Sequence, residues 1–301
     1  MSIGVSHLRA LVAVVDAGGF GAAATRLGIS QSAVSHAIAS LERITGRPVL
    51  TRSGIPSPTR LGERILEHAR AAVTAVAAVE QLAHQRDDQV AGRLVLAAPP
   101  TVCHGLVPTL LNRWRVEFPD VRVTLFEGDD DEVDGWLEQA TVDLAVLVDP
   151  AARHDDGVQL GADSFYAVLR ADHPLANQPK IDLLDLSDDD FLLSAGGCER
   201  QLRMLYWRAG VPLTPAHRVR QLSTLFAMIR AGVGVSVVPG LADGMQGDGV
   251  LMVPLTVTLQ RTLVLSGPQN RPWHPAASAL VTSASVVAAS TVPELVGVAG
   301  R

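Results

Sequence analysis

The chain has 301 residues, 48 % of them hydrophobic, which is enough for a small domain and a larger one with its own core. No run of about eighteen apolar residues is free of charges and turn signals, so we expect no membrane partner and a cytoplasmic location. The two cysteines are not spaced as zinc ligands, so we expect neither a metal nor a cofactor.

Charge is divided unevenly along the chain. The net charge is −6, yet residues 1–58 hold five arginines against two acids and carry +3, which leaves −9 for the remainder. A basic N-terminal part is compatible with double-stranded DNA as a partner, and the acidic remainder disfavours indiscriminate binding to phosphate. Because an excess of +3 is modest, we expect two or more copies to act together on DNA.

The segment from Phe20 to Leu41 has the pattern of a helix-turn-helix. Gly28 stands where a first helix would end in the left-handed conformation, and Ser30 stands where a second helix needs a cap. Beyond Ser30, apolar residues recur at helical spacing and would pack against the rest of the domain. These residues are Val34, Ala37, Ile38, Leu41 and Ile44.

The opposite arc of the second helix is small, polar and almost free of acids, which suits a helix that reads base edges in the major groove. A small polar face is also typical of any solvated helix, so the pattern alone leaves both interpretations open. The DNA-binding residues that we predict lie on this helix and in the turn-rich loop, or wing, that follows: Ser30, Gln31, Ser32, Ser35, His36, Arg43, Arg52 and Ser53.

The first 65 residues resemble the N-terminal domain of the LysR-type transcriptional regulators. The matching stretches include Ala23-Ala24-Thr25-Arg26-Leu27 and Ser30-Gln31-Ser32-Ala33-Val34-Ser35, together with residues 8–14, 19–20, 38, 41–42, 46, 50, 52, 58–59 and 61–62. The resemblance is looser but traceable to about Val287. Gly19 departs from a common capping serine, Ser32 from a common proline and His36 from a common arginine, so no operator sequence follows from the resemblance.

Two further helices flank this motif. Ser6 is the predicted cap of a first helix that ends at Gly18, and Thr59 is the predicted cap of a long helix that reaches about Arg86. The long helix carries an apolar seam: Leu61, Ile65, Ala69, Ala72, Val76, Val79 and Ala83. Pairing with the same helix of a second subunit would bury the seam, as the resemblance also implies, whereas a helix lying back on the large domain is the alternative. We expect a homodimer or a homotetramer.

We therefore predict an α+β multidomain protein with a winged helix-turn-helix at residues 1–58, a linker and dimerisation helix at 59–88, and an effector-binding domain at 89–301. In the last part, short apolar runs alternate with amphipathic segments, which predicts βα units and a mainly parallel sheet. Two crossings divide it into subdomain I, about 89–165 and 266–301, and subdomain II, about 166–265. The resemblance implies that these two Rossmann-like subdomains form a periplasmic-binding-protein-like α/β fold.

An effector is expected in the cleft between the subdomains, beyond the carboxyl ends of the strands. Free amides at the start of the helix after residues 94–98 favour an anion, so we predict a small-molecule, anionic effector. From this side we predict contacts from Pro100, Thr101, Val102 and Cys103, and from the opposite side contacts from Ser194, Gly196, Ser223 and Thr224. Plain helix capping is the alternative role for each serine and threonine.

Other motifs leave fewer possibilities. Cys103 and Cys198 fall near predicted helix starts on opposite lips of the cleft, where a thiol pKa is lowered, so a redox-locked cleft and ordinary packing thiols are alternatives. The acidic runs at 129–132 and 188–190 fit a divalent metal less well than solvated loops and helix starts. The glycines of 232–237 lack the third glycine of a dinucleotide loop. An architectural DNA protein would not need the α/β part, so we predict a ligand-responsive regulator, not an enzyme, with RNA polymerase as a further candidate partner.

Overall fold

The computed structural model describes residues 2–51, 54–84, 90–150, 154 and 157–291. The N-terminal part contains α1 (Val5–Ala17), α2 (Phe20–Leu27) and α3 (Gln31–Thr45), followed by the long helix α4 (Arg60–His84). The first three helices share one apolar core, which includes Leu11, Val14 and Leu41. Gly28 ends α2 with φ 67°, in the left-handed region that glycine adopts without strain. Among the described residues, no single helix has the length and apolar content of a membrane span, and only the α1–α2 pair, bent by 120°, passes that test.

The start of α1 differs from the prediction. Gly4, not Ser6, is the N-cap, and its amide donates to Nδ1 of His7 at 3.0 Å. The helix therefore begins one residue before the predicted cap, because a histidine three residues further on supplies the acceptor that Ser6 was expected to provide.

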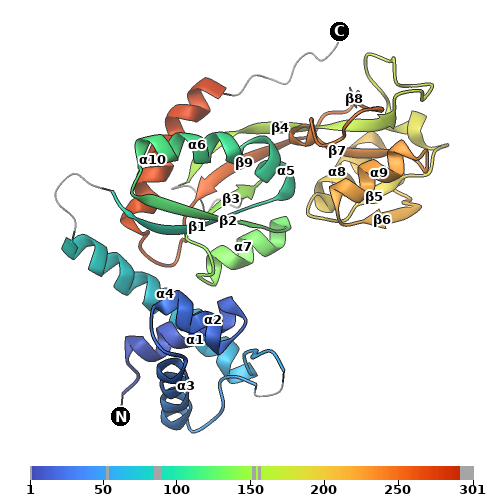
Figure 1. Cartoon of the computed structure of the whole chain (residues 1–301). Helices are drawn as coiled ribbons and strands as arrows, with labels where there is room; N and C mark the ends of the chain where they lie inside the picture. Colours follow the sequence, from blue (N-terminus) through green and yellow to red (C-terminus); the bar gives the residue numbers. More distant parts are fainter. Residues whose placement is uncertain (1, 52–53, 85–89, 151–153, 155–156, 292–301) are drawn as a thin grey trace.

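Helix α4 packs along α1 rather than standing free (Figure 1). Its Arg70 pairs with Asp16 of α1 at 2.5 Å, and its Glu80 pairs with Arg9 of α1 at 2.7 Å. Leu61 and Ile65, at the start of the predicted seam, pack against the three-helix core. The first half of the seam thus has a partner within its own domain, contrary to the sequence analysis, whereas Val79 near the other end is 65 % exposed.

The larger part contains a mixed sheet of order β2-β1-β3-β9-β4-β7, with β8 also paired to β4. Its strands are β1 (Gly92–Ala98), β2 (Val121–Glu127), β3 (Leu144–Val148), β4 (Val158–Arg170), β7 (Ser236–Pro239), β8 (Val250–Pro254) and β9 (Gln260–Ser266). A second, two-stranded parallel sheet joins β5 (Leu192–Ser194) and β6 (His217–Val219). The pairs of β1 with β2 and β3 are parallel, but every pair that involves β4 or β9 is antiparallel, so the prediction of a mainly parallel sheet is wrong.

Helices cover both parts of this domain. They are α5 (Pro100–Gly105), α6 (Val107–Glu117), α7 (Asp130–Glu138), α8 (Glu199–Ala209), α9 (Leu222–Arg230) and α10 (Pro275–Thr291), with short 3-10 helices at Leu183–Leu186 (η2) and Gly240–Ala242 (η3). Trp114 of α6 and the strands β1, β3 and β9 bury one apolar core, while Leu202 and Tyr206 of α8 belong to a separate one. The domain therefore has two cores, one for each subdomain.

Strand β4 belongs to both subdomains. Its residues up to Ser164 pair with β9, and its residues from Phe165 onward pair with β7 and β8. In Figure 1 it extends from the central sheet to the second subdomain. Strand β9 pairs with β3 and with the first half of β4, so the chain re-enters subdomain I at about residue 260 rather than at the predicted residue 266.

Candidate functional site

Helix α3 presents two chemically distinct faces. Val34, Ile38 and Leu41 are buried, and the structure leaves the six predicted DNA-binding residues of its N-cap and helix exposed, from Ser30 to Arg43. Ser30 caps the helix, since its Oγ accepts the Ala33 amide at 3.2 Å. Arg52 and Ser53, the two predicted residues of the wing, lie outside the described residues.

The single acid of α3 is tied to the neighbouring segment. Glu42 Oε1 accepts the backbone amides of Val49 at 2.9 Å and Leu50 at 3.4 Å. Leu50 then pairs with Pro58 in an antiparallel bridge at the base of the wing. The exposed arc of α3, from Gln31 to Arg43, therefore offers hydroxyl, amide, imidazole and guanidinium groups and no exposed carboxylate, which is the chemistry that base edges and phosphates require.

At the start of α5, the predicted effector contacts serve the protein interior. Thr101 is buried, and its Oγ1 accepts a hydrogen bond from Nη2 of Arg261 at 2.8 Å. Arg261 also pairs with Asp163 at 2.7 Å, and the two side chains are only 2 % and 3 % exposed. Val102 lies in the core of subdomain I, and Pro100 precedes Thr101 in the first turn. The sequence analysis missed Arg261 and Asp163, which stand on the two strands that connect the subdomains.

A cavity of about 690 Å³ lies between the subdomains. Subdomain I contributes the start of α7, the end of β3 and His154, and subdomain II contributes Ala195, Gly197 and the start of α8. Arg220 joins the two sides by an ion pair with Asp129 at 2.9 Å. Asp149 joins them as well: its carboxylate accepts from Gln201 of α8 at 3.4 Å and from the Thr262 amide of β9 at 2.8 Å.

Asp149 follows β3 with φ 49°, a left-handed conformation that is uncommon for a residue other than glycine. Its backbone amide donates to the Thr262 carbonyl at 2.9 Å, which holds this conformation in place. Local strain of this kind is often found where a chain must present a functional group at a fixed position. Here it places a carboxylate at the junction of β3, β9 and α8.

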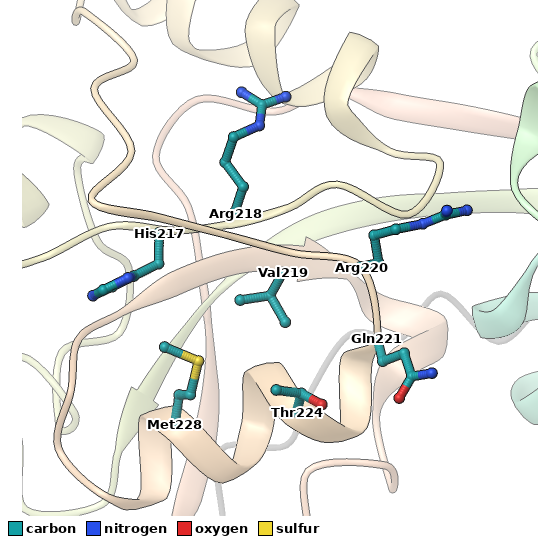
Figure 2. Close-up of a pocket in the computed structure, with 7 residues that line it drawn as sticks. All are labelled: His217, Arg218, Val219, Arg220, Gln221, Thr224 and Met228. Carbon is teal, nitrogen blue, oxygen red and sulfur yellow. The ribbon is translucent and has the colours of Figure 1, made fainter.

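The predicted contacts of subdomain II are divided between two places. Ser194 is buried at the end of β5, and Gly196 packs so closely that a Cβ atom would lie 2.4 Å from the Arg220 carbonyl. Ser223 and Thr224 are exposed, and Thr224 lines a different pocket of about 510 Å³ between β6 and α9. In Figure 2, Thr224 and Met228 face Val219, while Arg218 extends in the opposite direction. The structure therefore does not bring Ser223 and Thr224 to the cleft cavity.

The ionisable groups of the cleft reflect burial. Burial, with a smaller contribution from Asp131, raises the pKa of Asp130 to about 6, although Arg261, Gln201 and Arg200 act in the opposite direction. Burial and Glu127 raise the pKa of Cys103 to about 12, and burial also raises the pKa of Cys198. The prediction that helix starts lower these two thiol pKa values is therefore wrong, because desolvation outweighs the helix amides.

Both cysteines are free, and Cys103 Sγ donates to the Ala98 carbonyl at 3.3 Å, as a packing thiol does. Within the ranges that the structure describes, no group of three His, Cys, Asp or Glu side chains could hold a metal ion. The run at 129–132 instead opens α7: the Asp129 amide donates to Glu132 Oε2 at 2.9 Å in a capping box.

A three-helix unit with an exposed polar helix, joined to a two-lobed domain with a cavity between its lobes, defines a DNA-binding protein with a ligand-sensing domain. Two family models match this chain: the bacterial regulatory helix-turn-helix protein of the lysR family over residues 5–63, and the LysR substrate binding domain over residues 87–286. The chain belongs to the LysR family of transcriptional regulators. The family assignment and the multidomain architecture predicted from the sequence are thereby confirmed, and the chain is a regulator rather than an enzyme.

Individual relatives extend over most of the chain. It is 30 % identical over 236 residues to the uncharacterised regulator YvbU of Bacillus subtilis (strain 168), a match that spans 77 % of this chain and 80 % of YvbU. It is 30 % identical to LrrA of Synechococcus elongatus, a probable transcriptional regulator, over 86 % of this chain and 88 % of that one. The solved structure of a full-length OxyR variant from Pseudomonas aeruginosa is 25 % identical with a TM-score of 0.74, over 95 % of this chain and 100 % of that one.

Proposed function

We propose that this chain reads DNA through the exposed face of α3 and alters transcription when a small molecule binds in the cleft between subdomains I and II. The observation that carries the DNA part is the exposed, acid-free arc of α3, whose one carboxylate is directed to the base of the wing. The cavity between the subdomains supports the ligand part, because closure about β4 and β9 would change how the two lobes sit on either side of it.

We further propose that the chain acts as a homodimer or homotetramer. Val79 and the outer half of the α4 seam supply an apolar surface for a second copy. Two copies would set their recognition helices on half-sites about 34–36 Å apart, or a multiple of that spacing. RNA polymerase stays a candidate partner of the DNA-bound form.

The anionic class of the effector stays a prediction with little support. It depends on the amides at the start of α5, but that helix has only six residues, and Thr101 already accepts from Arg261. Asp163 balances the charge of Arg261. The carboxylates that line the cavity favour a different class of ligand.

Substitutions on α3 test the DNA-reading proposal. Ser35→Ala and His36→Ala remove hydrogen-bonding groups from the exposed arc, so each should relax base preference by about 1–3 kcal/mol while leaving affinity for random DNA nearly unchanged. Arg43→Ala removes a cation two turns beyond His36, so it should weaken binding to specific and random DNA alike and lower the salt slope by about one.

The measurement is a gel-shift titration of a genomic fragment selected by the wild-type protein against a scrambled duplex, at several salt concentrations. Arg208→Ala, on the exposed surface of α8, is the matched control and should change neither affinity nor slope. Equal losses on both duplexes for Ser35→Ala and His36→Ala would show that α3 does not read bases.

A further inference from the structure

The cleft cavity is lined mainly by acids. Its charged lining consists of Asp129, Asp130, Asp131, Glu132, Asp134, Asp149 and Glu199, against Arg200, Arg203 and His154. These acids come from both subdomains, since Glu199 opens α8 and the others belong to the start of α7 or follow β3. A ligand that enters this space therefore meets negative charge from two sides.

The arginines around the cavity are mostly engaged. Arg220 pairs with Asp129, and both Arg203 and Arg218 pair with Glu199. Arg200 reaches only one carboxylate, Asp149, at 3.9 Å. Among the described residues, no ion pair within 4.0 Å forms at Asp130 or Asp131, so these two acids of α7 line the cavity without a paired cationic side chain.

Gln201 provides an independent indication of the chemistry of the ligand. The residue is 3 % exposed, and its Nε2 donates to Asp149 while the amide also contacts Asp130. Its Oε1 has no hydrogen-bond partner among the described residues. A buried carbonyl oxygen without a donor is costly, so this oxygen calls for a hydrogen-bond donor beside two carboxylates.

We propose that the cavity binds a cationic small molecule, an amine or a guanidine, with Asp130 and Asp131 as its charge partners and the Gln201 amide oxygen as a further acceptor. The inference rests on the proposed function, in which this cleft is the effector site. Ammonium and guanidinium groups carry only donors, which matches a lining whose unsatisfied atoms are acceptors. An anion would instead meet uncompensated like charge.

The rest of the cavity sets the size and shape of the ligand. Leu147, Val148, Pro150 and Ala195 supply apolar wall, which suits a short alkyl chain between polar ends. A volume of about 690 Å³ lies within the ordinary range of small-molecule sites, about 300–1,000 Å³. A cation held by Asp130 on one side would also be attracted by Glu199 on the other, and so would favour the closed cleft.

Isothermal titration calorimetry on the full chain at pH 7.5 tests the proposal, with agmatine, cadaverine and L-arginine as cationic probes and glutarate as an anion of similar length. We expect at least one cationic probe to bind and glutarate not to bind. Asp131→Asn, on an exposed side chain, and Asp130→Asn should each weaken that probe at least tenfold. Asp248→Asn, an exposed acid in a turn away from the cavity, is the matched control and should leave affinity unchanged.

Three outcomes would overturn the proposal: glutarate binding in place of the cations, no cationic probe binding up to 10 mM, or equal affinity in all three variants. The gel-shift titration separates this failure from that of the proposed function. A protein that still selects its operator but ignores cations is a regulator with another class of ligand. A protein that binds the probe but discriminates no duplex retains the site and loses the proposed DNA-reading role.

Discussion

Asp130 is the residue at which the electrostatics of the cleft are concentrated. It opens α7 and is faced by Arg261 from β9, by Arg200 and Gln201 from α8, and by its neighbour Asp131. Desolvation outweighs the two arginines and raises its pKa from 3.8 to about 6. A carboxylate with such a pKa is poorly compensated in the unliganded protein.

This raised pKa predicts an unusual dependence of stability on pH. Because the folded protein holds the proton at Asp130 up to pH of about 6 and the unfolded chain releases it near 3.8, the contribution of this group to stability falls as pH rises through that window. Asp130→Asn removes the ionised form, so it should raise the free energy of unfolding at pH 7.5 by about 1–2 kcal/mol. Urea unfolding at pH 4, 5, 6 and 7.5 measures this, and an unchanged difference between wild type and variant across the series would contradict it.

Local contacts of single residues were the part of the structure most accessible from sequence. The Ser30 cap and the Gly28 stop involve neighbours within a few positions, so residue type and spacing suffice to predict them. The Arg261–Asp163 pair joins residues 98 positions apart, and the Arg261–Thr101 bond joins residues 160 positions apart. Nothing in the local pattern of β9 distinguishes a buried, paired arginine from an exposed one.

At the scale of elements, the junction between the wing and α4 depends on one close approach. A Cβ atom on Gly62 would lie 2.0 Å from the Val49 carbonyl oxygen, which is backbone and cannot move aside. Gly62→Ala should therefore destabilise the N-terminal domain by about 3 kcal/mol or more. Native-state hydrogen exchange of the α1 amides reports the opening free energy of that domain.

Gly21→Ala on α2 is the matched comparison for this test. A Cβ there meets nothing closer than Gln31 Oε1 at 3.9 Å, so the alanine should stabilise the same amides by about 0.5–1 kcal/mol. Equal protection in the two variants would mean that α4 and the Val49 segment separate without cost.

Element identity was predicted better than element partners. The spacing of α4 revealed an apolar seam, but a seam does not state what covers it, and the three-helix core covers its first half. Only the second half of β4 was predicted, because Gly161, Asp163 and Ser164 interrupt the apolar run in its first half. Strand β8 was missed because its five residues follow a glycine-rich turn and alternate only partly.

At the scale of the whole molecule, the exposed end of α4 predicts the state of assembly. Val79 is 65 % exposed on the seam, so Val79→Glu should place charge in the proposed dimer contact and weaken self-association about tenfold. Sedimentation equilibrium measures the change. Leu184→Glu, at a position 61 % exposed in η2, is the matched control and should leave the mass distribution unaltered.

The order of domains followed from the sequence because composition and periodicity change at their borders. The cleft did not, since Asp129, Asp149 and Gln201 meet only after two crossings bring α7, β3 and α8 together. The predicted contacts Ser223 and Thr224 failed to reach the cavity for the same reason: a helix start after a strand is a local pattern, and its position around the cleft is not.

Strand β4 is a single ribbon of thirteen residues shared by two cores. A crossover between two related genes within this strand would join half of one ladder to half of another, and the return strand β9 would then come from a different parent from the strands it must pair with. An intact lobe is transferred only when both junctions move together. Diversification of ligand preference in this architecture is therefore expected to proceed by substitution around the cavity rather than by exchange of lobes.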